Sequence, residues 1–342
     1  MSFAFDFCVD EGVDEPTVKA PASNAESAQP TYFLPARPVS PSSLRAQLPA
    51  KLSYSPAVAY EGNERVVLAR RDLFDIRFQI LNEDGTFADE QSDLIPGVYE
   101  GGMKTWECSL DLVAELHSRV QESRRHDPSW PAGRHIVELG CGTALPSCYL
   151  LQTLFCATHE AEQRSMLSLC DYNEQVLSLV VYPNLLLAWY FSEVGPGHTE
   201  GLTPEEPGDL ELDDELLDQF EQALPQFGIQ LRFFAGGWDT LSLEPLADVI
   251  LSSETTYALD TIPSLRRVLA ASSWPTDEEN VKAGIDTQTT LCLIASKVLY
   301  FGVGGGVEPF RSNVLAHRGW CKHVRSFTAG VGRSVLRIGW SS

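Results

Sequence analysis

The chain has 342 residues, of which 44% are hydrophobic and 21% are charged, and this composition excludes a wholly disordered protein. Lysine and arginine number 25 against 47 aspartates and glutamates, which gives a formal net charge of −22. Such a polyanion repels phosphate backbones, so we expect no direct nucleic-acid ligand. The charge suits a basic protein partner, or it only keeps the protein soluble.

The cysteines and the start of the chain indicate an intracellular protein. None of the eight cysteines forms a C-x-x-C pair and most lie inside apolar runs, which favours reduced thiols and no metal site. The first residues are acidic where a signal peptide is basic. The apolar stretch at 176–191 is interrupted by Ser178, Pro183 and Asn184, so we expect no membrane span and a cytoplasmic location.

Residues 1 to about 60 are rich in proline, alanine and serine and show no apolar periodicity. They predict a disordered tail, in which Phe3, Phe5 and Phe7 form either a docking motif or an idle terminus. A folded domain is expected over residues 61–342. Residues 64–81 predict a strand or hairpin.

After Gly133 strands alternate with helices, which predicts an α/β fold with a mostly parallel sheet and helices on both faces. The two final strands have no helix between them and predict an antiparallel C-terminal hairpin at one end of the sheet. The expected strands are 135–139, 166–171, 229–234, 247–253, 290–297, 321–327 and 333–340, and the expected helices are 104–120, 146–156 and 173–190.

An acidic insertion is predicted at about residues 195–222, between the second of these helices after Gly133 and the third strand. It is interpreted either as a solvated surface helix and loop or as a cradle for a basic substrate.

The most informative segment follows the first strand and reads Glu138-Leu139-Gly140-Cys141-Gly142. The glycines allow a tight turn in which a ligand approaches the backbone before the next helix begins. Dinucleotide sites prefer a third glycine, where this chain has Leu145. S-adenosylmethionine sites favour an acidic residue two positions before the first glycine, and Glu138 is there, able to face the charged end of that cofactor.

Further candidate side chains follow the other strands. Asp171 ends the second strand and either accepts hydrogen bonds from ribose hydroxyls or caps the next helix. Trp238, which follows Gly237, and Trp106 could stack on an adenine or belong to the core. The fourth strand ends at Ser253, and the next residues, Glu254 to Tyr257, lie at the edge where ligands bind in such sheets. Glu254 and Tyr257 are therefore expected to face the substrate, or else to cap the following helix.

Five segments together resemble the histidine protein methyltransferase branch of the seven-β-strand, S-adenosylmethionine-dependent methyltransferases, which have a Rossmann-like sheet. They read YEGGMKTWECSLDLV, VELGCGTALPS, CDYNEQVL, SSETTY and KVLYFGVGGGVEPF, and the resemblance runs from about residue 64 to the end. Glu254 to Tyr257 resembles the D/E-x-x-Y motif that helps place the target side chain in related lysine and histidine methyltransferases. The cofactor-binding residues that we expect are Trp106, Glu138, Leu139, Gly140, Cys141, Gly142, Asp171, Gly237, Trp238 and Ser253.

This resemblance implies an enzyme that methylates a histidine in a large-subunit ribosomal protein, in the cytoplasm or the nucleus. We expect a monomer. The attacking imidazole nitrogen must be neutral, Glu254 could accept the N–H of the other ring nitrogen, and Tyr257 could pack on the ring. The residues alone leave open a lysine methyltransferase of the same fold, a methyltransferase for small molecules, and a module that binds a ribosomal protein without turnover. A nicotinamide dehydrogenase is disfavoured by the missing third glycine.

Overall fold

A computed structural model describes residues 34–84, 101–156, 164–279 and 289–341 of the chain. The chain divides into two units, residues 1–32 and 33–342. The first unit lies outside the described residues, and so do the phenylalanines predicted as a docking motif. Everything below concerns the second unit.

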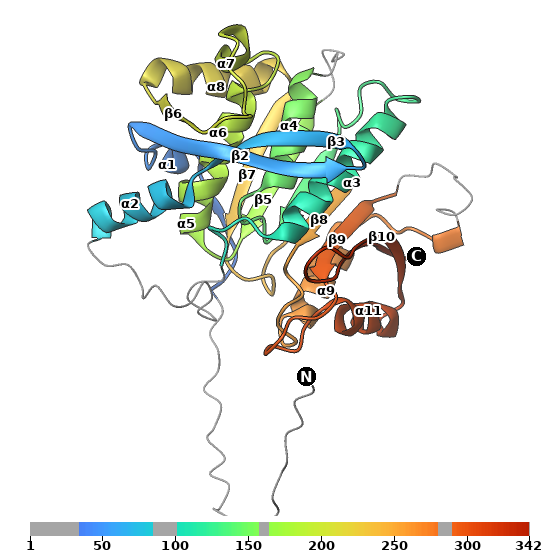
Figure 1. The fold of residues 1–342 in the computed structure, drawn as a ribbon. Coiled ribbons are helices and arrows are strands. Elements are labelled where there is room, and N and C mark those ends of the chain that lie inside the picture. Colours follow the sequence, from blue (N-terminus) through green and yellow to red (C-terminus); the bar gives the residue numbers. More distant parts are fainter. Residues whose placement is uncertain (1–33, 85–100, 157–163, 280–288, 342) are drawn as a thin grey trace, which may run out of the picture. The chain divides into compact units, whose positions relative to one another are not determined.

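The central feature is an 8-stranded sheet with the order β1-β7-β5-β4-β8-β9-β11-β10 (Figure 1). The strands β7, β5, β4, β8 and β9 are parallel to one another, whereas β1 is antiparallel to β7 and β11 is antiparallel to both β9 and β10. Their bounds are β1 (Arg37–Val39), β4 (His135–Leu139), β5 (Ser165–Asp171), β7 (Ile229–Ala235), β8 (Val249–Ser253), β9 (Leu291–Lys297), β10 (Gly319–Phe327) and β11 (Arg333–Trp340). The predicted parallel sheet with a C-terminal hairpin is confirmed.

Helices cover both faces of this sheet, as predicted. Alternate residues of β4 point to opposite sides, so Ile136 packs in a core with α3 and α4, whereas Val137 packs in a second core with α9 and α11. The helices are α1 (Pro41–Arg45), α2 (Leu73–Asp84), α3 (Glu107–Ser123), α4 (Leu145–Cys156), α5 (Glu174–Val176), α6 (Tyr182–Tyr190), α7 (Pro196–Thr199), α8 (Asp214–Gln226), α9 (Ile262–Ser272) and α11 (Val307–Ala316), with a π-helical segment η1 (Leu177–Val181) between α5 and α6.

A second, 3-stranded sheet has the order β3-β2-β6, and it lies against α3, α4 and α6 (Figure 1). It contains β2 (Lys51–Glu61), β3 (Glu64–Arg71) and β6 (Gly208–Glu211). The segment 64–81 begins with the strand β3, which pairs with β2 before it, and its second half belongs to α2, so a hairpin within the segment is not formed.

The predicted disordered tail differs from the structure over residues 34–60, which form β1, α1 and most of β2. β1 pairs with the edge strand β7 of the main sheet. In β2 the apolar residues Leu52, Tyr54 and Ala59 are buried. Alanines, serines and a proline stand among them, and this composition resembles a disordered segment although its alternation is that of a half-buried strand.

The acidic insertion combines β6 with the amphipathic helix α8, which buries Leu217 and Phe220. The acidic face of α8 is partly taken up inside the chain, because Arg45 of α1 lies 2.7 Å from both Asp218 and Glu221. The segment is thus a surface helix and loop of the fold. These contacts leave less of its charge for a substrate.

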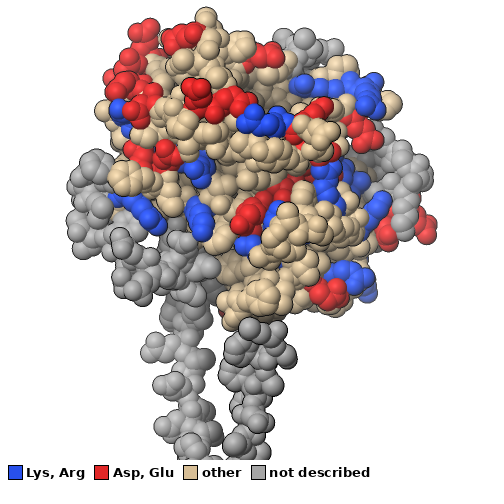
Figure 2. Space-filling view, viewed as in Figure 1, with Lys and Arg blue, Asp and Glu red and all other residues tan. Residues whose placement is uncertain are grey.

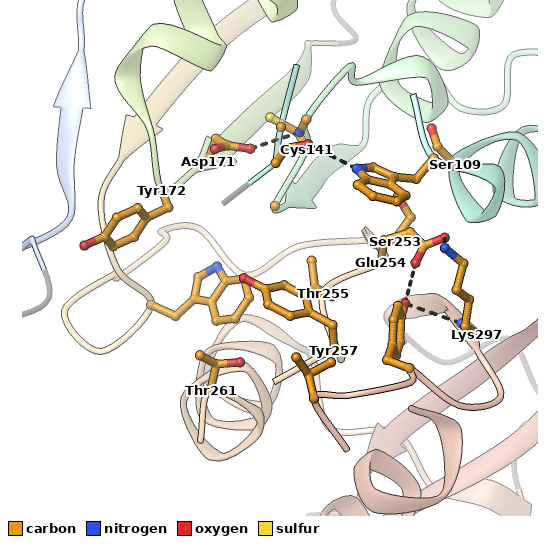
Figure 3. A pocket seen from close by; sticks show the side chains of 18 of the residues that line it. Ser109, Cys141, Asp171, Tyr172, Ser253, Glu254, Thr255, Tyr257, Thr261 and Lys297 are labelled. Atoms are coloured by element: carbon orange, nitrogen blue, oxygen red, sulfur yellow. Dashed lines mark hydrogen bonds and ion pairs between the residues drawn. The ribbon is translucent and has the colours of Figure 1, made fainter. Parts of the chain in front are cut away.

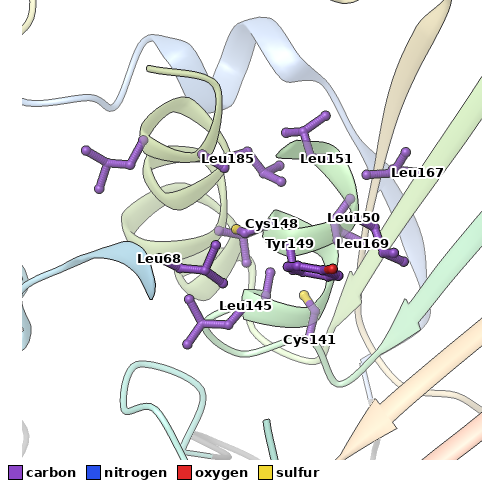
Figure 4. Packing of buried hydrophobic residues seen from close by; sticks show 14 of the residues in the cluster. Leu68, Cys141, Leu145, Cys148, Tyr149, Leu150, Leu151, Leu167, Leu169 and Leu185 are labelled. Carbon is purple, nitrogen blue, oxygen red and sulfur yellow. The ribbon is translucent and has the colours of Figure 1, made fainter. Parts of the chain in front are cut away.

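The core beside β4 fixes the start of α4. Leu145 and Cys148 of α4 pack with Leu185 of α6 and Leu68 of β3, and all four are fully or almost fully buried (Figure 4). At about 25 cal/mol for each Å² of apolar surface buried, such side chains contribute roughly 1.5–3 kcal/mol each. This packing holds the first turn of α4 directly after the glycine-containing loop 140–143. Among the described residues no helix has the length and apolar character needed to cross a membrane.

Candidate active site

A cavity of about 440 Å³ opens at the carboxyl ends of β4, β5, β7 and β8, a size typical of small-molecule sites. β4 pairs with β5 on one side and with β8 on the other, so this is the point where the direction of winding reverses and where open α/β sheets bind ligands. The predicted site residues that line the cavity are Trp106, Gly140, Cys141, Gly142, Asp171, Gly237, Trp238, Ser253, Glu254 and Tyr257. Their contact with a ligand remains a prediction.

The loop between β4 and α4 requires its glycines. Gly140 has a φ of +61° and Gly142 a φ of +51°, a region that other residues rarely adopt. A Cβ atom on Gly140 would lie only 2.5 Å from the Cγ2 atom of Thr255. The loop therefore passes close to the segment after β8, and its backbone faces the cavity.

Asp171 connects this loop to the end of β5. Its Oδ2 atom accepts a hydrogen bond of 3.0 Å from the backbone N–H of Gly142, and its Oδ1 atom accepts one of 3.1 Å from that of Asn173. Asp171 also lines the cavity (Figure 3). The carboxylate thus fixes the loop while it remains within reach of a ligand.

Glu138 and Leu139 do not line the cavity. Glu138 is fully buried behind the loop, where its Oε2 atom accepts hydrogen bonds from the backbone N–H of Ser147, at 3.0 Å, and from the Ser147 hydroxyl. Burial raises the pKa of Glu138 to about 8, and the bonds from Ser147 offset only part of this shift. Leu139 is buried in the core on the α9 side of the sheet. The structure places both as supports of the loop.

Two further glycines, which were not predicted as site residues, contact the loop between β4 and α4. Gly101 and Gly102 line the cavity, and a Cβ on Gly142 would lie 3.3 Å from the carbonyl oxygen of Gly102. The indole N–H of Trp106 donates a hydrogen bond of 3.1 Å to the carbonyl oxygen of Gly101. In the sequence, both glycines belong to the segment YEGGMKTWE, which is part of the resemblance to the methyltransferase family.

Glu254 lies directly after β8 with a φ of +57°, a strained conformation for a residue other than glycine. Its Oε2 atom accepts a hydrogen bond of 2.6 Å from the hydroxyl of Tyr300, and its Oε1 atom is 3.5 Å from the Lys297 ammonium (Figure 3). The Glu254 and Lys297 side chains are only 8% and 15% exposed. The ammonium offsets part of the cost of burying the carboxylate, and it also lies 3.5 Å from the Oε2 atom of Glu107.

Tyr300 and Lys297 are the residues that sequence reasoning missed, although both belong to the segment KVLYFGVGGGVEPF. Lys297 ends β9 and lies 4.8 Å from the centre of the Trp106 ring. Burial, and next the Glu254 carboxylate, raise the pKa of Tyr300 above its usual value. Tyr300 therefore remains a neutral hydrogen-bond donor to Glu254.

Tyr257 is held by the loop that follows β9. Its carbonyl oxygen accepts a hydrogen bond of 3.1 Å from the N–H of Gly305, and its ring centre is 6.4 Å from that of Tyr300 in an edge-to-face arrangement. Figure 3 shows Tyr257, Glu254 and Lys297 on one side of the cavity and Asp171 on the other.

The cavity wall holds two buried polar atoms, Ser109 Oγ and Glu254 Oε1, that have no hydrogen-bond partner within the described part of the chain. Both atoms are almost inaccessible to solvent, and the Oε1 atom of Glu254 lies 3.5 Å from the Lys297 ammonium. Within the same ranges no cluster of histidine, cysteine and acidic side chains could hold a metal ion.

Comparison with known proteins agrees with this geometry. No family model matches the chain. Histidine protein methyltransferase 1 of Schizosaccharomyces pombe is 30% identical over 308 residues, which are 84% of this chain and 80% of that protein. Histidine protein methyltransferase 1 of Saccharomyces cerevisiae is 30% identical over 275 residues, which are 72% of this chain and 68% of that protein.

Solved structures give weaker likenesses. The N-methyltransferase NodS from Bradyrhizobium japonicum, in complex with S-adenosyl-L-homocysteine, has a TM-score of 0.35 and 12% identity, over 66% of this chain and 86% of that one. Magnesium protoporphyrin IX methyltransferase from Synechocystis, with bound SAM, has a TM-score of 0.34 and 12% identity, over 70% of this chain and 86% of that one. The family assignment therefore rests on the two yeast relatives, whose identity over more than two thirds of their lengths shows that this chain belongs to the histidine protein methyltransferase 1 family.

Proposed function

We propose that this protein transfers a methyl group from S-adenosyl-L-methionine to a histidine side chain of a protein, and that the substrate is a large-subunit ribosomal protein. One observation carries the proposal. A single cavity joins the glycine loop and Asp171 to a buried carboxylate that two other side chains hold in place, in a chain that belongs to the histidine protein methyltransferase 1 family.

The residues present fit this cofactor. The backbone at Gly140 and Gly142 is bare toward the cavity, Asp171 can accept hydrogen bonds from ribose hydroxyls, and Trp238 offers a flat apolar surface to an adenine. Ser109 also lines the cavity. Glu138 takes no direct part in this proposal, because it supports the loop from behind. When bound, the cofactor supplies an electrophilic methyl group whose carbon–sulfur bond breaks as a nitrogen lone pair attacks.

Glu254 is proposed to orient the target ring. A neutral imidazole has one nitrogen with a free lone pair and one that carries a hydrogen. In this proposal the Oε1 atom of Glu254, which lies 3.5 Å from the Lys297 ammonium, accepts that N–H, which fixes the tautomer and leaves the other nitrogen to attack. Tyr300 holds the opposite oxygen, so the carboxylate cannot turn away. Tyr257 lies in the same wall, and its ring packs beside the imidazole.

The position of Lys297 favours histidine over lysine as the target. Its ammonium is 3.5 Å from both Glu254 Oε1 and Glu107 Oε2, and a second ammonium placed beside Glu254 would be repelled by Lys297. A neutral imidazole meets no such repulsion. The ribosomal identity of the substrate rests on the resemblance of the motifs, and the net charge of −22 supports a basic partner of that kind.

The proposal is tested with labelled S-adenosyl-L-methionine and a fraction of large-subunit ribosomal proteins from cells that lack the enzyme. We expect one protein of the fraction to take up label and the Glu254→Gln variant to lose at least 100-fold in rate, since a neutral amide holds the imidazolium of the transition state less strongly. Binding of S-adenosyl-L-homocysteine, measured by calorimetry, is expected to persist in the variant. Binding of S-adenosyl-L-homocysteine by the wild type without transfer to any protein would point to a binding module instead.

A further inference from the structure

Apolar side chains are exposed around the mouth of the cavity. We define the apolar rim as the six residues Leu259, Val298, Leu299, Phe301, Val303 and Val331, all of them large hydrophobic residues that the fold leaves exposed. Phe301 is the extreme case, with 84% of its surface exposed. Exposed hydrophobic residues scattered singly need no explanation, but a cluster of them beside a cleft marks an interaction site.

The apolar rim is continuous with the proposed active site. Four of its members, Leu299, Phe301, Val303 and Val331, line the same cavity as Glu254 and Tyr257. Phe301 follows Tyr300, which bonds to Glu254. A chain that places a side chain against Glu254 therefore lays its neighbouring residues on the rim.

The backbone of the rim is held in place before any partner arrives. The N–H of Gly305 donates a hydrogen bond of 3.1 Å to the carbonyl oxygen of Tyr257, and the N–H of Gly306 donates one of 2.9 Å to that of Thr256. The N–H of Val298 donates a hydrogen bond of 2.8 Å to the carbonyl oxygen of Gly332. The exposed side chains thus stand on two loops that are fastened to each other and to the β10–β11 turn. A preformed surface loses little entropy when a partner binds.

The charges on this side of the molecule agree with an apolar contact. Acidic side chains gather over α7, α8 and β6, whereas the region over the loop between β9 and α11 shows mostly uncharged residues (Figure 2). The net charge of −22 can attract a basic protein from a distance, while the apolar rim provides the contact next to the reacting group.

We infer that the apolar rim receives the substrate segment that carries the target histidine, and that this segment has a large apolar side chain within about three residues of the histidine, a reach of roughly 10 Å for an extended chain. This inference rests on the proposed function. It adds a requirement on the substrate, since a histidine flanked only by charged residues would leave the rim uncovered and would bind poorly.

The test compares two phenylalanines of almost equal exposure. Phe301→Ser removes the most exposed side chain of the rim, and Phe74→Ser is the matched control, because Phe74 on α2 is 81% exposed and does not line the cavity. Both variants are assayed for kcat/KM of methyl transfer onto the ribosomal-protein fraction and for S-adenosyl-L-homocysteine affinity. We expect Phe301→Ser to lose at least 10-fold in kcat/KM with unchanged cofactor-product affinity, and Phe74→Ser to behave as the wild type. The double variant Leu299→Ser/Val331→Ser should show the same loss of kcat/KM.

The sequence of the methylated peptide is a second measurement, and we expect it to contain a large apolar residue within about three residues of the modified histidine. Equal kcat/KM in the two phenylalanine variants, or a modified histidine with only charged neighbours, would overturn the inference while leaving the proposed function intact. A gain of activity in Phe301→Ser would also overturn it, because it would mean that the rim binds the chain itself or a second copy. If the wild type labels no protein at all, the proposed function fails first.

Discussion

The hydroxyl of Tyr300 donates a hydrogen bond of 2.6 Å to the Oε2 atom of Glu254. The two residues are 46 positions apart in the chain, but they follow β9 and β8, which are parallel neighbours in the sheet. Their side chains therefore meet at the same edge. The bond engages the Oε2 atom of Glu254, while its Oε1 atom lies 3.5 Å from the Lys297 ammonium.

Removing this bond tests whether the carboxylate has to be held. Tyr300→Phe should lower kcat by about 10- to 100-fold, because a hydrogen bond to a charged group contributes roughly 1.5–3 kcal/mol. Affinity for S-adenosyl-L-homocysteine should not change. Tyr60→Phe on β2, where the tyrosine is exposed, is the matched control. The positioning role would be refuted by a Tyr300→Phe enzyme with normal kcat, or by one whose loss appears only in cofactor affinity.

The pH dependence of the rate separates the two target side chains. A histidine target must be neutral, so kcat/KM should rise with pH through about 6.5 and level off above about 7.5. A lysine target would continue to gain rate toward its pKa near 10.4. The profile is measured between pH 5.5 and 9.5 in buffers of constant ionic strength. A rate that is still rising tenfold per unit at pH 9 would contradict the histidine account.

The loop between β4 and α4 offers a steric test with a built-in rescue. Gly140→Ala places a methyl group 2.5 Å from Thr255 Cγ2 and requires a φ of +61°, for which we expect at least a 10-fold loss of S-adenosyl-L-homocysteine affinity. Thr255→Ser removes that Cγ2 atom but keeps the hydroxyl, which lies 2.7 Å from Ser252 Oγ. The double variant should regain part of the affinity in calorimetry. Normal affinity of the Gly140→Ala single variant for S-adenosyl-L-homocysteine would show that the loop accommodates the added methyl group.

Glu138 should make the stability of the protein depend on pH. Its pKa is raised to about 8 in the folded protein, so the carboxyl keeps its proton where the unfolded chain, with a pKa near 4.3, has lost it. The contribution of the protonated Glu138 carboxyl to the free energy of unfolding is fully present below about pH 4.3, and it is lost as the pH rises toward 8. Glu138→Gln should therefore gain on the order of 2–4 kcal/mol of unfolding free energy relative to the wild type between pH 5 and 8. Guanidinium denaturation at both pH values measures this gain, and a difference that stays constant with pH would refute the assignment.

The predictions that the structure confirms are those that need only local pattern and sheet geometry. The apolar runs at 135–139 and 166–171 are consecutive buried strands, and strand ends in a parallel sheet share one edge. This reasoning brings Gly140, Asp171 and Glu254 into one cavity without any knowledge of their contacts.

The features that the sequence did not predict depend on which way a side chain points or on contacts between distant segments. Glu138 fits a cofactor-facing acid by its spacing, but it belongs to a strand of five consecutive buried residues and turns to Ser147. Tyr300 lies in a glycine-rich loop, where no periodicity gives a direction. β1 is too short to show a pattern, and it is ordered by pairing with β7, nearly 200 residues away.

The most direct test of the account is amino-acid analysis of the ribosomal-protein fraction after incubation with the enzyme and S-adenosyl-L-methionine labelled in the methyl group. Complete acid hydrolysis followed by chromatography against standards separates the two methylhistidines from the methyllysines. We predict that the enzyme-dependent label appears in one methylhistidine and disappears with Glu254→Gln. Label in methyllysine would contradict the central claim.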